Sequence, residues 1–180
     1  MSLAFSRRSF LKYTAVAAVA VAGASLFSGC ESQGDSYNLL KEGAGSMTIL
    51  QTTAEMGTYD ESTKKYTAPE VTTSTKEIAF PFKVTANRTN PVSINPNNFK
   101  VTVSSKDGST VKKYTVAVDA DLYNTNLKKG NSSSGYVTVT GLSGLEEGGS
   151  VVLTYCPDLQ YNEYSLNWQL TVAANSTTTE

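Results

Sequence analysis

Few residues of this 180-residue chain could carry out catalysis, because the chain contains no histidine. Without histidine there is no Ser-His-Asp or Cys-His nucleophile, no His-ligated zinc and no imidazole that shuttles protons at neutral pH. Asp119 and Asp121 would share one side of an extended strand, but calcium takes six or more oxygens and no calcium loop surrounds them. Glu146 and Glu147 lie in a glycine-rich turn and predict solvated side chains. We therefore expect no catalytic residue, no metal site and no cofactor.

The two cysteines predict different roles. Cys156 ends an apolar stretch, which favours a buried small hydrophobe over a reactive thiol. Cys30 follows Ser28 and Gly29, whose small side chains leave a peptide bond open to a peptidase, and its thiol could then accept a diacylglyceryl group. If Cys30 carries lipid, Cys156 has no partner in the chain, so a disulfide framework is excluded.

Residues 1–29 have the layout of a cleavable export signal. Positive charge precedes an apolar run over residues 13–26, and no acidic residue occurs before Glu31. The run is shorter than the roughly 20 apolar residues that span a bilayer. Residues 6–12 (SRRSFLK) resemble the signal of the bacterial twin-arginine pathway, and residues 27–30 (FSGC) resemble a lipoprotein processing box. The export-signal residues are Arg7, Arg8, Phe10, Leu11 and Lys12.

These two resemblances imply a location and an anchor. The twin-arginine translocase would export the chain, signal peptidase would cleave before Cys30, and palmitate-type acyl chains on Cys30 would hold the protein on the outer side of the bacterial cell membrane. General secretion and a signal without lipidation are the alternatives.

Net charge argues against nucleic-acid binding. The chain has 15 basic and 16 acidic residues, and loss of Arg7, Arg8 and Lys12 with the signal leaves 12 against 16, a net charge of −4. The remaining lysine pairs are scattered among acidic residues, so a bound nucleic acid would release few counterions.

The mature chain divides into three predicted parts. Residues 30–46 are rich in Gly, Ser and Asn and predict a flexible tether that follows the lipidated Cys30. Residues 47–172 form one domain, and residues 173–180 predict a disordered tail. Within the domain, the polar interval 53–75 predicts a long surface connection.

Apolar residues in the domain alternate with a period of two, which indicates half-buried strands. Threonine, valine and tyrosine are abundant, and no helical stripe occurs after the signal. Strands that are each apolar on one face must stack as two sheets, so we predict an all-β antiparallel sandwich of about seven strands. The seven predicted strands are 47–51, 78–86, 99–103, 114–118, 136–139, 151–155 and 164–172.

Turn and strand motifs within residues 78–172 carry a family resemblance. The chain resembles the immunoglobulin-like domain of unknown function that is common in bacterial surface lipoproteins, whose labels sometimes borrow the words telomeric repeat-binding factor. The resemblance implies an immunoglobulin-like sandwich and no catalytic residues, and the charge balance opposes DNA binding. The motifs are residues 82–94 (FKVTANRTNPVSI), 97–99 (NNF), 107–108 (DG), 127–130 (LKKG) and 135–137 (GYV).

Exposed aromatic residues are the best candidates for partner binding. Tyr164 and Trp168 share the phase of an apolar strand and predict core positions rather than a sugar platform, whereas Tyr161 breaks that phase and predicts exposure. Tyr59 and Tyr66 lie in the long polar interval.

These features predict a tethered binding or interaction module of the cell envelope, without catalysis, that binds an envelope protein or a glycan. The alternatives are an accessory subunit of an exported enzyme, a carbohydrate-binding module and a passive spacer.

Overall fold

The computed structural model describes residues 38–161 and 163–175. The predicted signal peptide 1–29 and the predicted lipidation site lie outside the described residues, so both stay predictions. The residues concerned are Arg7, Arg8, Phe10, Leu11, Lys12 and the lipidation site Cys30.

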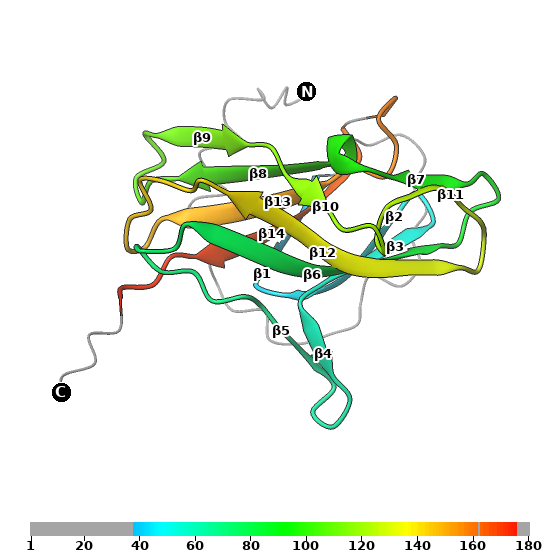
Figure 1. Ribbon diagram of the computed structural model, residues 1–180, viewed down its shortest axis with the longest axis horizontal. Coiled ribbons are helices and arrows are strands. Elements are labelled where there is room, and N and C mark those ends of the chain that lie inside the picture. The colour runs from blue at the N-terminus through cyan, green and yellow to red at the C-terminus, as the bar shows by residue number, and fades with distance from the viewer. Residues whose placement is uncertain (1–37, 162, 176–180) are drawn as a thin grey trace, which may run out of the picture. The chain divides into compact units, whose positions relative to one another are not determined.

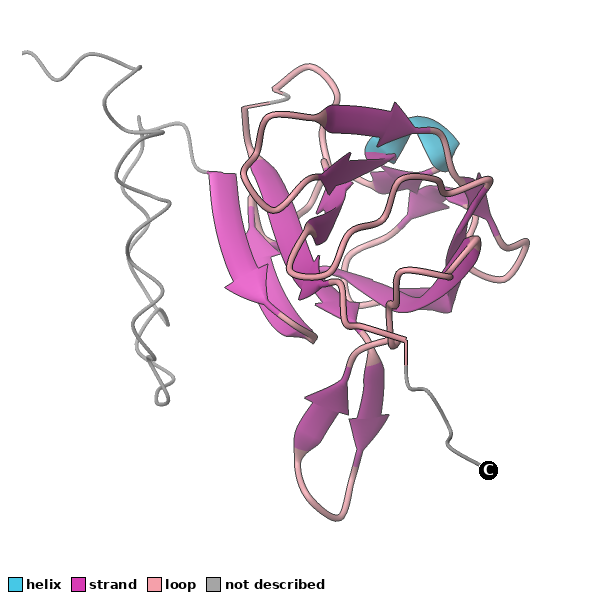
Figure 2. Ribbon diagram, turned by 90° about the vertical axis from the view of Figure 1, so that its left-hand side faces the viewer, coloured by secondary structure: helices cyan, strands magenta, loops and turns pink. Residues whose placement is uncertain are grey.

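Two five-stranded sheets form the domain (Figures 1 and 2). The first sheet has the order β1 (Asn38–Glu42), β14 (Ser165–Thr171), β13 (Ser150–Tyr155), β8 (Phe99–Ser104) and β9 (Val111–Tyr114). The second has the order β10 (Ala117–Val118), β12 (Ser132–Thr140), β6 (Glu77–Ala86), β3 (Thr52–Met56) and β2 (Gly45–Ile49). The smaller elements are the pair β4 (Thr58–Asp60) and β5 (Lys65–Thr67), the pair β7 (Val92–Ile94) and β11 (Asn124–Leu127), and the 3-10 helix η1 (Pro96–Asn98).

The strand order is that of an immunoglobulin-like sandwich. Strands β3, β6, β12 and β10 take the places of A, B, E and D in one sheet, and β8, β13 and β14 take those of C, F and G in the other. Strand β9 extends the second group as a C′ strand does. Neighbours within each sheet pair antiparallel, except that β1 runs parallel to β14. The predicted all-β, immunoglobulin-like sandwich is confirmed.

The core lies between the two sheets and is centred on Phe82. Strand β6 alternates between exposed and buried positions, so Phe82 points inward. Its ring contacts three aromatic rings of the facing sheet edge to face, with centroid distances of 5.1 Å to Phe99, 5.5 Å to Tyr155 and 5.3 Å to Trp168. The quadrupoles of aromatic rings favour edge-to-face contacts, so these contacts join the two sheets with a preferred geometry.

The prediction of a flexible tether over residues 30–46 is wrong for its last part, because β1 and the start of β2 lie there. Backbone hydrogen bonds to β14 hold β1, and two of its side chains, Leu39 and Leu40, are exposed. The indole N–H of Trp168 donates to the Gly45 carbonyl at 2.9 Å. Such backbone pairing leaves no alternation in the sequence, which is why the pattern of residues did not reveal the strand.

Three further boundaries differ from the prediction. The interval 53–75 is not one loop, because β3 places Ala54 and Met56 in the core and a hairpin follows it. The predicted strand 114–118 is split between β9 and β10, which belong to different sheets. The predicted tail begins with ordered residues, since the Ala173 N–H donates to the Val71 carbonyl at 2.8 Å.

Replacement of Phe82 by alanine tests the core. We expect Phe82→Ala to lower the free energy of unfolding by about 3 to 5 kcal/mol, because it removes three ring contacts and leaves a cavity. The matched control is Lys83→Ala on the same strand, whose side chain points outward and which should cost less than about 1 kcal/mol. Chemical denaturation measures both. Equal losses would contradict the inward orientation of Phe82.

Candidate functional site

A two-stranded hairpin projects from the second sheet and carries both tyrosines predicted for partner binding. It consists of residues 58–67, with β4 and β5 joined by a turn, and we call it the tyrosine hairpin (Figures 1 and 2). Tyr59 and Tyr66 lie directly opposite each other, with ring centroids 4.8 Å apart. Tyr59 is 40% exposed. The structure therefore brings two predicted site residues together on one face of an element that lies outside the core.

Gly57 fixes the point at which the chain leaves the sheet. Its φ is +100°, and a Cβ built on it would lie 2.5 Å from the Ala44 Cβ and 2.7 Å from the Thr67 carbonyl oxygen. Only glycine fits this backbone conformation and close approach. The Gly57 N–H also donates to the Pro81 carbonyl at 2.8 Å, which ties the base of the hairpin to β6.

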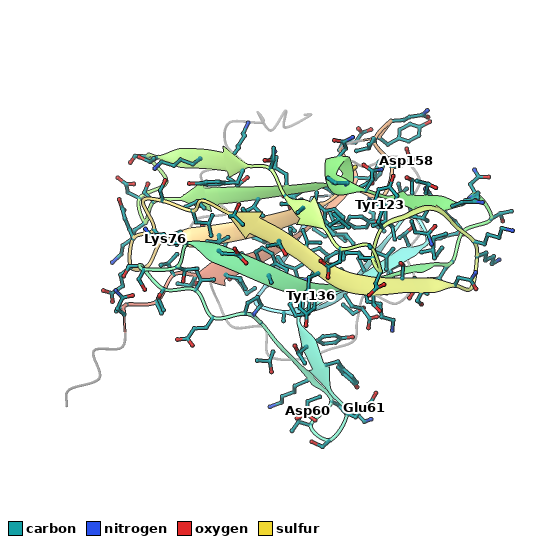
Figure 3. All side chains as sticks on the ribbon, viewed as in Figure 1. Asp60, Glu61, Lys76, Tyr123, Tyr136 and Asp158 are labelled. Atoms are coloured by element: carbon teal, nitrogen blue, oxygen red, sulfur yellow. The ribbon has the colours of Figure 1, made fainter. Side chains whose placement is uncertain are left out.

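The tip of the hairpin is stabilised by the carboxylate of Asp60. This carboxylate accepts hydrogen bonds from the hydroxyl and backbone N–H of Ser62 and from those of Thr63. These bonds, the Ser62 hydroxyl first, lower the pKa of Asp60 to about 2. Asp60 stays ionised at neutral pH and holds the turn, which lies far from the sandwich (Figure 3).

A polar chain connects the hairpin to the outer face of the second sheet, which is the face turned away from the core. The Tyr66 hydroxyl donates to Glu55 on β3, and Glu55 forms an ion pair of 2.9 Å with Lys83 on β6. Partial burial tends to raise the pKa of Glu55, but the hydrogen bonds from Tyr66 and Lys83 outweigh this effect and lower it. Burial and the same carboxylate raise the pKa of Tyr66. Both groups therefore keep their charge states at neutral pH, and the Tyr66 ring is held in place.

The hairpin and the sheet enclose a corner with aromatic and charged groups on both sides. Tyr136 on β12 lies opposite Pro81 on β6, and Pro81 binds the base of the hairpin. Tyr136 is 48% exposed and lies on the side of the sheet from which the hairpin projects (Figure 3). We call this surface the corner, and its residues are Glu55, Tyr59, Tyr66, Pro81, Lys83 and Tyr136.

Hydroxyl groups continue the outer face beyond the corner. The register places Thr48, Thr53, Thr85 and Ser132 in one row across four strands. Thr48 and Thr53 hydroxyls are 2.9 Å apart, and those of Thr85 and Ser132 are 2.8 Å apart. The row places exposed and half-exposed hydroxyl groups on the outer face of the sheet.

Tyr161 does not join the corner. It is 52% exposed, as predicted, and its ring contacts Tyr164 at a centroid distance of 6.4 Å. Its loop includes Asp158, which Figure 3 shows on the other side of the domain from Asp60. The three predicted partner-binding tyrosines thus divide into a pair and a distant single residue.

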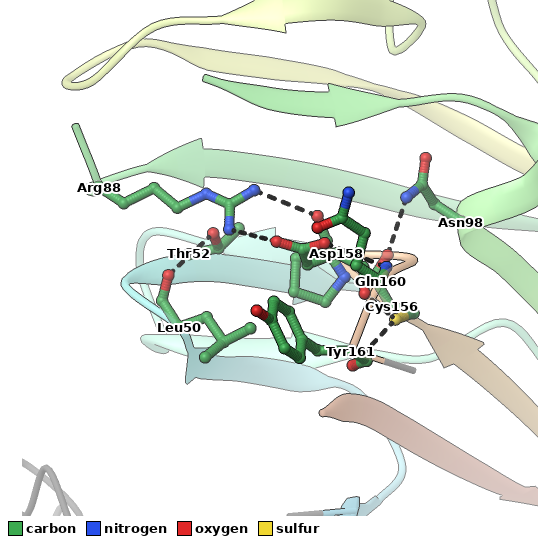
Figure 4. A network of polar contacts seen from close by, with 9 residues as sticks. Leu50, Thr52, Arg88, Asn98, Cys156, Asp158, Gln160 and Tyr161 are labelled. Carbon is green, nitrogen blue, oxygen red and sulfur yellow. Dashed lines mark hydrogen bonds and ion pairs between the residues drawn. The ribbon is translucent and has the colours of Figure 1, made fainter. Parts of the chain in front are cut away.

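Internal contacts fix the loop that carries Tyr161 (Figure 4). Arg88 forms an ion pair of 3.3 Å with Asp158, and the Asn98 amide donates to the Cys156 carbonyl at 2.8 Å. Cys156 is buried, as predicted, and its thiol donates to the Asp158 carbonyl at 3.1 Å. Burial raises the pKa of the Cys156 thiol, which disfavours the reactive thiolate.

One of the four carboxylates in the two acidic pairs has a structural contact, and the glutamates are exposed. The Asp119 carboxylate accepts a hydrogen bond from the Tyr136 backbone N–H at 3.1 Å, and Glu146 and Glu147 are exposed. Among residues 38–161 and 163–175, no group of three or more His, Cys, Asp or Glu side chains could hold a metal ion. Within the same residues, none of the helices is both long and apolar enough to cross a membrane.

Four residues of the corner were not predicted as site residues from the sequence: Glu55, Pro81, Lys83 and Tyr136. One signal could have found Tyr136. Val137 and Val139 set the inward phase of β12, so Tyr136 is an aromatic residue in the outward phase. Glu55 was predicted to lie in a loop, so its position opposite Lys83 on the neighbouring strand could not be predicted.

Replacement of Tyr66 by phenylalanine tests the polar chain. Tyr66→Phe removes one hydrogen bond that favours the ionised carboxylate, so we expect the pKa of Glu55 to rise. NMR titration of the side-chain carboxyl measures it. A carboxyl group with a lowered pKa contributes stability that is lost as the pH falls through its folded-state pKa. Tyr66→Phe should therefore also make the free energy of unfolding fall less between neutral and acidic pH. Tyr59→Phe keeps the hydrogen bond and is the control. An unchanged pKa in Tyr66→Phe would contradict the contact.

Comparisons with known proteins show no family for this chain. No family model matches the chain, and no curated protein matches it. The resemblance to the immunoglobulin-like lipoprotein domain therefore stays a prediction.

Solved structures similar to this chain include bacterial proteins at low identity. The yjhA protein from Bacillus subtilis is 9% identical, with 73% of this chain and 98% of that chain covered and a TM-score of 0.44. The secreted protein MPT63 from Mycobacterium tuberculosis is 16% identical, with 75% and 99% covered and a TM-score of 0.41. The ycdA protein from Bacillus subtilis is 16% identical with a TM-score of 0.42, and 73% of this chain matches 39% of its length. Sequence identities and TM-scores this low assign no function to this chain.

Proposed function

We propose that this chain is an extracytoplasmic lipoprotein whose immunoglobulin-like domain binds a partner in the cell envelope through the tyrosine hairpin, without catalysis. The observation that carries the proposal is the pair Tyr59 and Tyr66, which is outside the core but held by the contact of Tyr66 with Glu55. An aromatic side chain fixed before binding loses little conformational entropy when a partner arrives. Aromatic residues also supply much of the energy of binding surfaces.

The hairpin adds little to the sandwich itself. All three residues of β4 are exposed, and β5 has only Tyr66 partly buried. An element that projects from a scaffold without filling its core is a typical place for binding residues.

The proposed location outside the cytoplasm rests on the predicted signal peptide. The resemblance of residues 6–12 to a twin-arginine signal and of residues 27–30 to a lipoprotein box supports export by the translocase, cleavage by signal peptidase and a lipid anchor on Cys30. An anchor with two acyl chains holds a protein on a membrane stably, whereas a single acyl chain gives only marginal membrane binding. The anchor would keep the domain at the membrane surface.

Replacement of Cys30 by serine tests the anchor. Cells that express Cys30→Ser should incorporate no radiolabelled palmitate into the protein, because serine offers no thiol for acylation. Cys156→Ser should keep the label of the wild type, since that thiol is buried. Equal labelling of wild type and Cys30→Ser would reject the anchor.

Replacement of the hairpin tests the binding surface. A variant with residues 58–67 replaced by a short Gly-Ser turn should fold, because β3 and its core residues stay, but should lose crosslinks to envelope partners in intact cells. The control shortens the exposed turn 105–110 between β8 and β9. Thermal unfolding verifies the fold of both variants. Undiminished crosslinks in the hairpin variant would favour a passive spacer.

A further inference from the structure

We propose that the corner binds a neutral glycan, with sugar rings against Tyr59 and Tyr136 and sugar hydroxyls against Glu55 and Lys83. This inference rests on the proposed function and names the ligand class for the same surface. It depends on three features: the placement of the rings, the polar groups on the same face, and the charge of the surface.

The rings lie on two surfaces that meet at an angle. Tyr66 reaches Glu55 on the outer face of the sheet, so the hairpin face that carries Tyr66 and Tyr59 is turned toward that face. Gly57 follows β3 and its N–H donates to the Pro81 carbonyl, and Pro81 lies opposite Tyr136 on the next strand, so Tyr136 lies about 10 Å from the base of the hairpin at the usual strand spacing. A chain of sugars that crosses the strands could contact both surfaces.

The polar groups of the corner suit hydroxyl-rich ligands. The Glu55 carboxylate accepts hydrogen bonds and the Lys83 ammonium donates them, and Lys83 is about half exposed. The aromatic faces match the apolar faces of pyranose rings, as aromatic side chains combine apolar area with fixed geometry. The row of Thr48, Thr53, Thr85 and Ser132 extends the same hydrogen-bonding surface along the sheet.

The charge of the surface favours a neutral ligand. Glu55, Asp60 and Glu61 balance Lys64, Lys65 and Lys83 in the hairpin and corner. A surface without net positive charge gives an anionic polymer no electrostatic gain.

The composition also favours a glycan over a protein partner. The centre of a protein interface is depleted in charged groups. The corner, by contrast, presents the ion pair of Glu55 and Lys83 on the same face as Tyr136. Exposed large aliphatic side chains of the described residues, such as Leu39, Val111 and Leu159, are not among the residues of the corner.

Binding to neutral carbohydrates tests the inference. Full-length protein in detergent is screened on an array of neutral oligosaccharides and on insoluble cellulose and chitin, and calorimetry then gives Kd for the best ligand. We expect binding that added salt does not weaken. Tyr59→Ala and Tyr136→Ala should each raise Kd about tenfold or more, since stacking on one aromatic ring contributes on this scale.

Matched variants separate stacking from unfolding. Tyr136→Phe keeps the ring and should keep the affinity within about twofold. Tyr123→Ala and Tyr161→Ala remove rings of similar exposure outside the corner, 49% and 52%, and should leave Kd unchanged. Circular dichroism verifies that every variant is folded.

Two results would overturn the inference: no retention on any neutral carbohydrate, or affinity that Tyr59→Ala and Tyr136→Ala leave unchanged. If no glycan binds but the hairpin replacement still loses crosslinks to envelope proteins, the partner is a protein and the proposed function stands. If the crosslinks also persist, both proposals fail.

Discussion

The alternation of side chains along β6 is the constraint on which both the core and the corner depend. Because successive residues of a strand point to opposite faces, Phe82 enters the aromatic core while its neighbours Pro81 and Lys83 enter the corner. A register shift of one residue would exchange the two sets and destroy both. The pairing of β6 with β3 and β12 fixes this register, and with it the distances between Glu55, Lys83 and Tyr136.

The sequence predicted those parts of the fold that depend on burial of large side chains. Phe80, Phe82 and Val84 identified β6, and Trp168 with Leu170 identified β14, because each lies in an unbroken apolar alternation. Strands that pair mainly through the backbone, such as β1, gave no such signal. β3 was missed for a related reason, since its inward positions include Thr52 and Ala54, which also occur in loops.

The candidate site was predictable in part. Tyr59 and Tyr66 were identified as exposed aromatic residues, but their pairing depends on a hairpin whose exit angle is set by Gly57 and Ala44, 13 residues apart. Glu55, Lys83 and Tyr136 come from three different strands, so their proximity follows from strand order and register. A single sequence shows which side chains could bind a ligand, whereas the sheet determines which of them meet.

The parallel pairing of β1 with β14 has a mechanical consequence. Tension on the residues that precede Asn38 enters the domain through β1, whose five residues pair with β14. When the pull is directed along the strand, these backbone hydrogen bonds bear the load together in shear and do not open one after another. The rate of forced unfolding depends on the barrier to rupture, so this arrangement resists brief loads better than equilibrium stability alone would suggest. β1 adds little to the core, yet it would be the strand that carries a load applied through the residues before it.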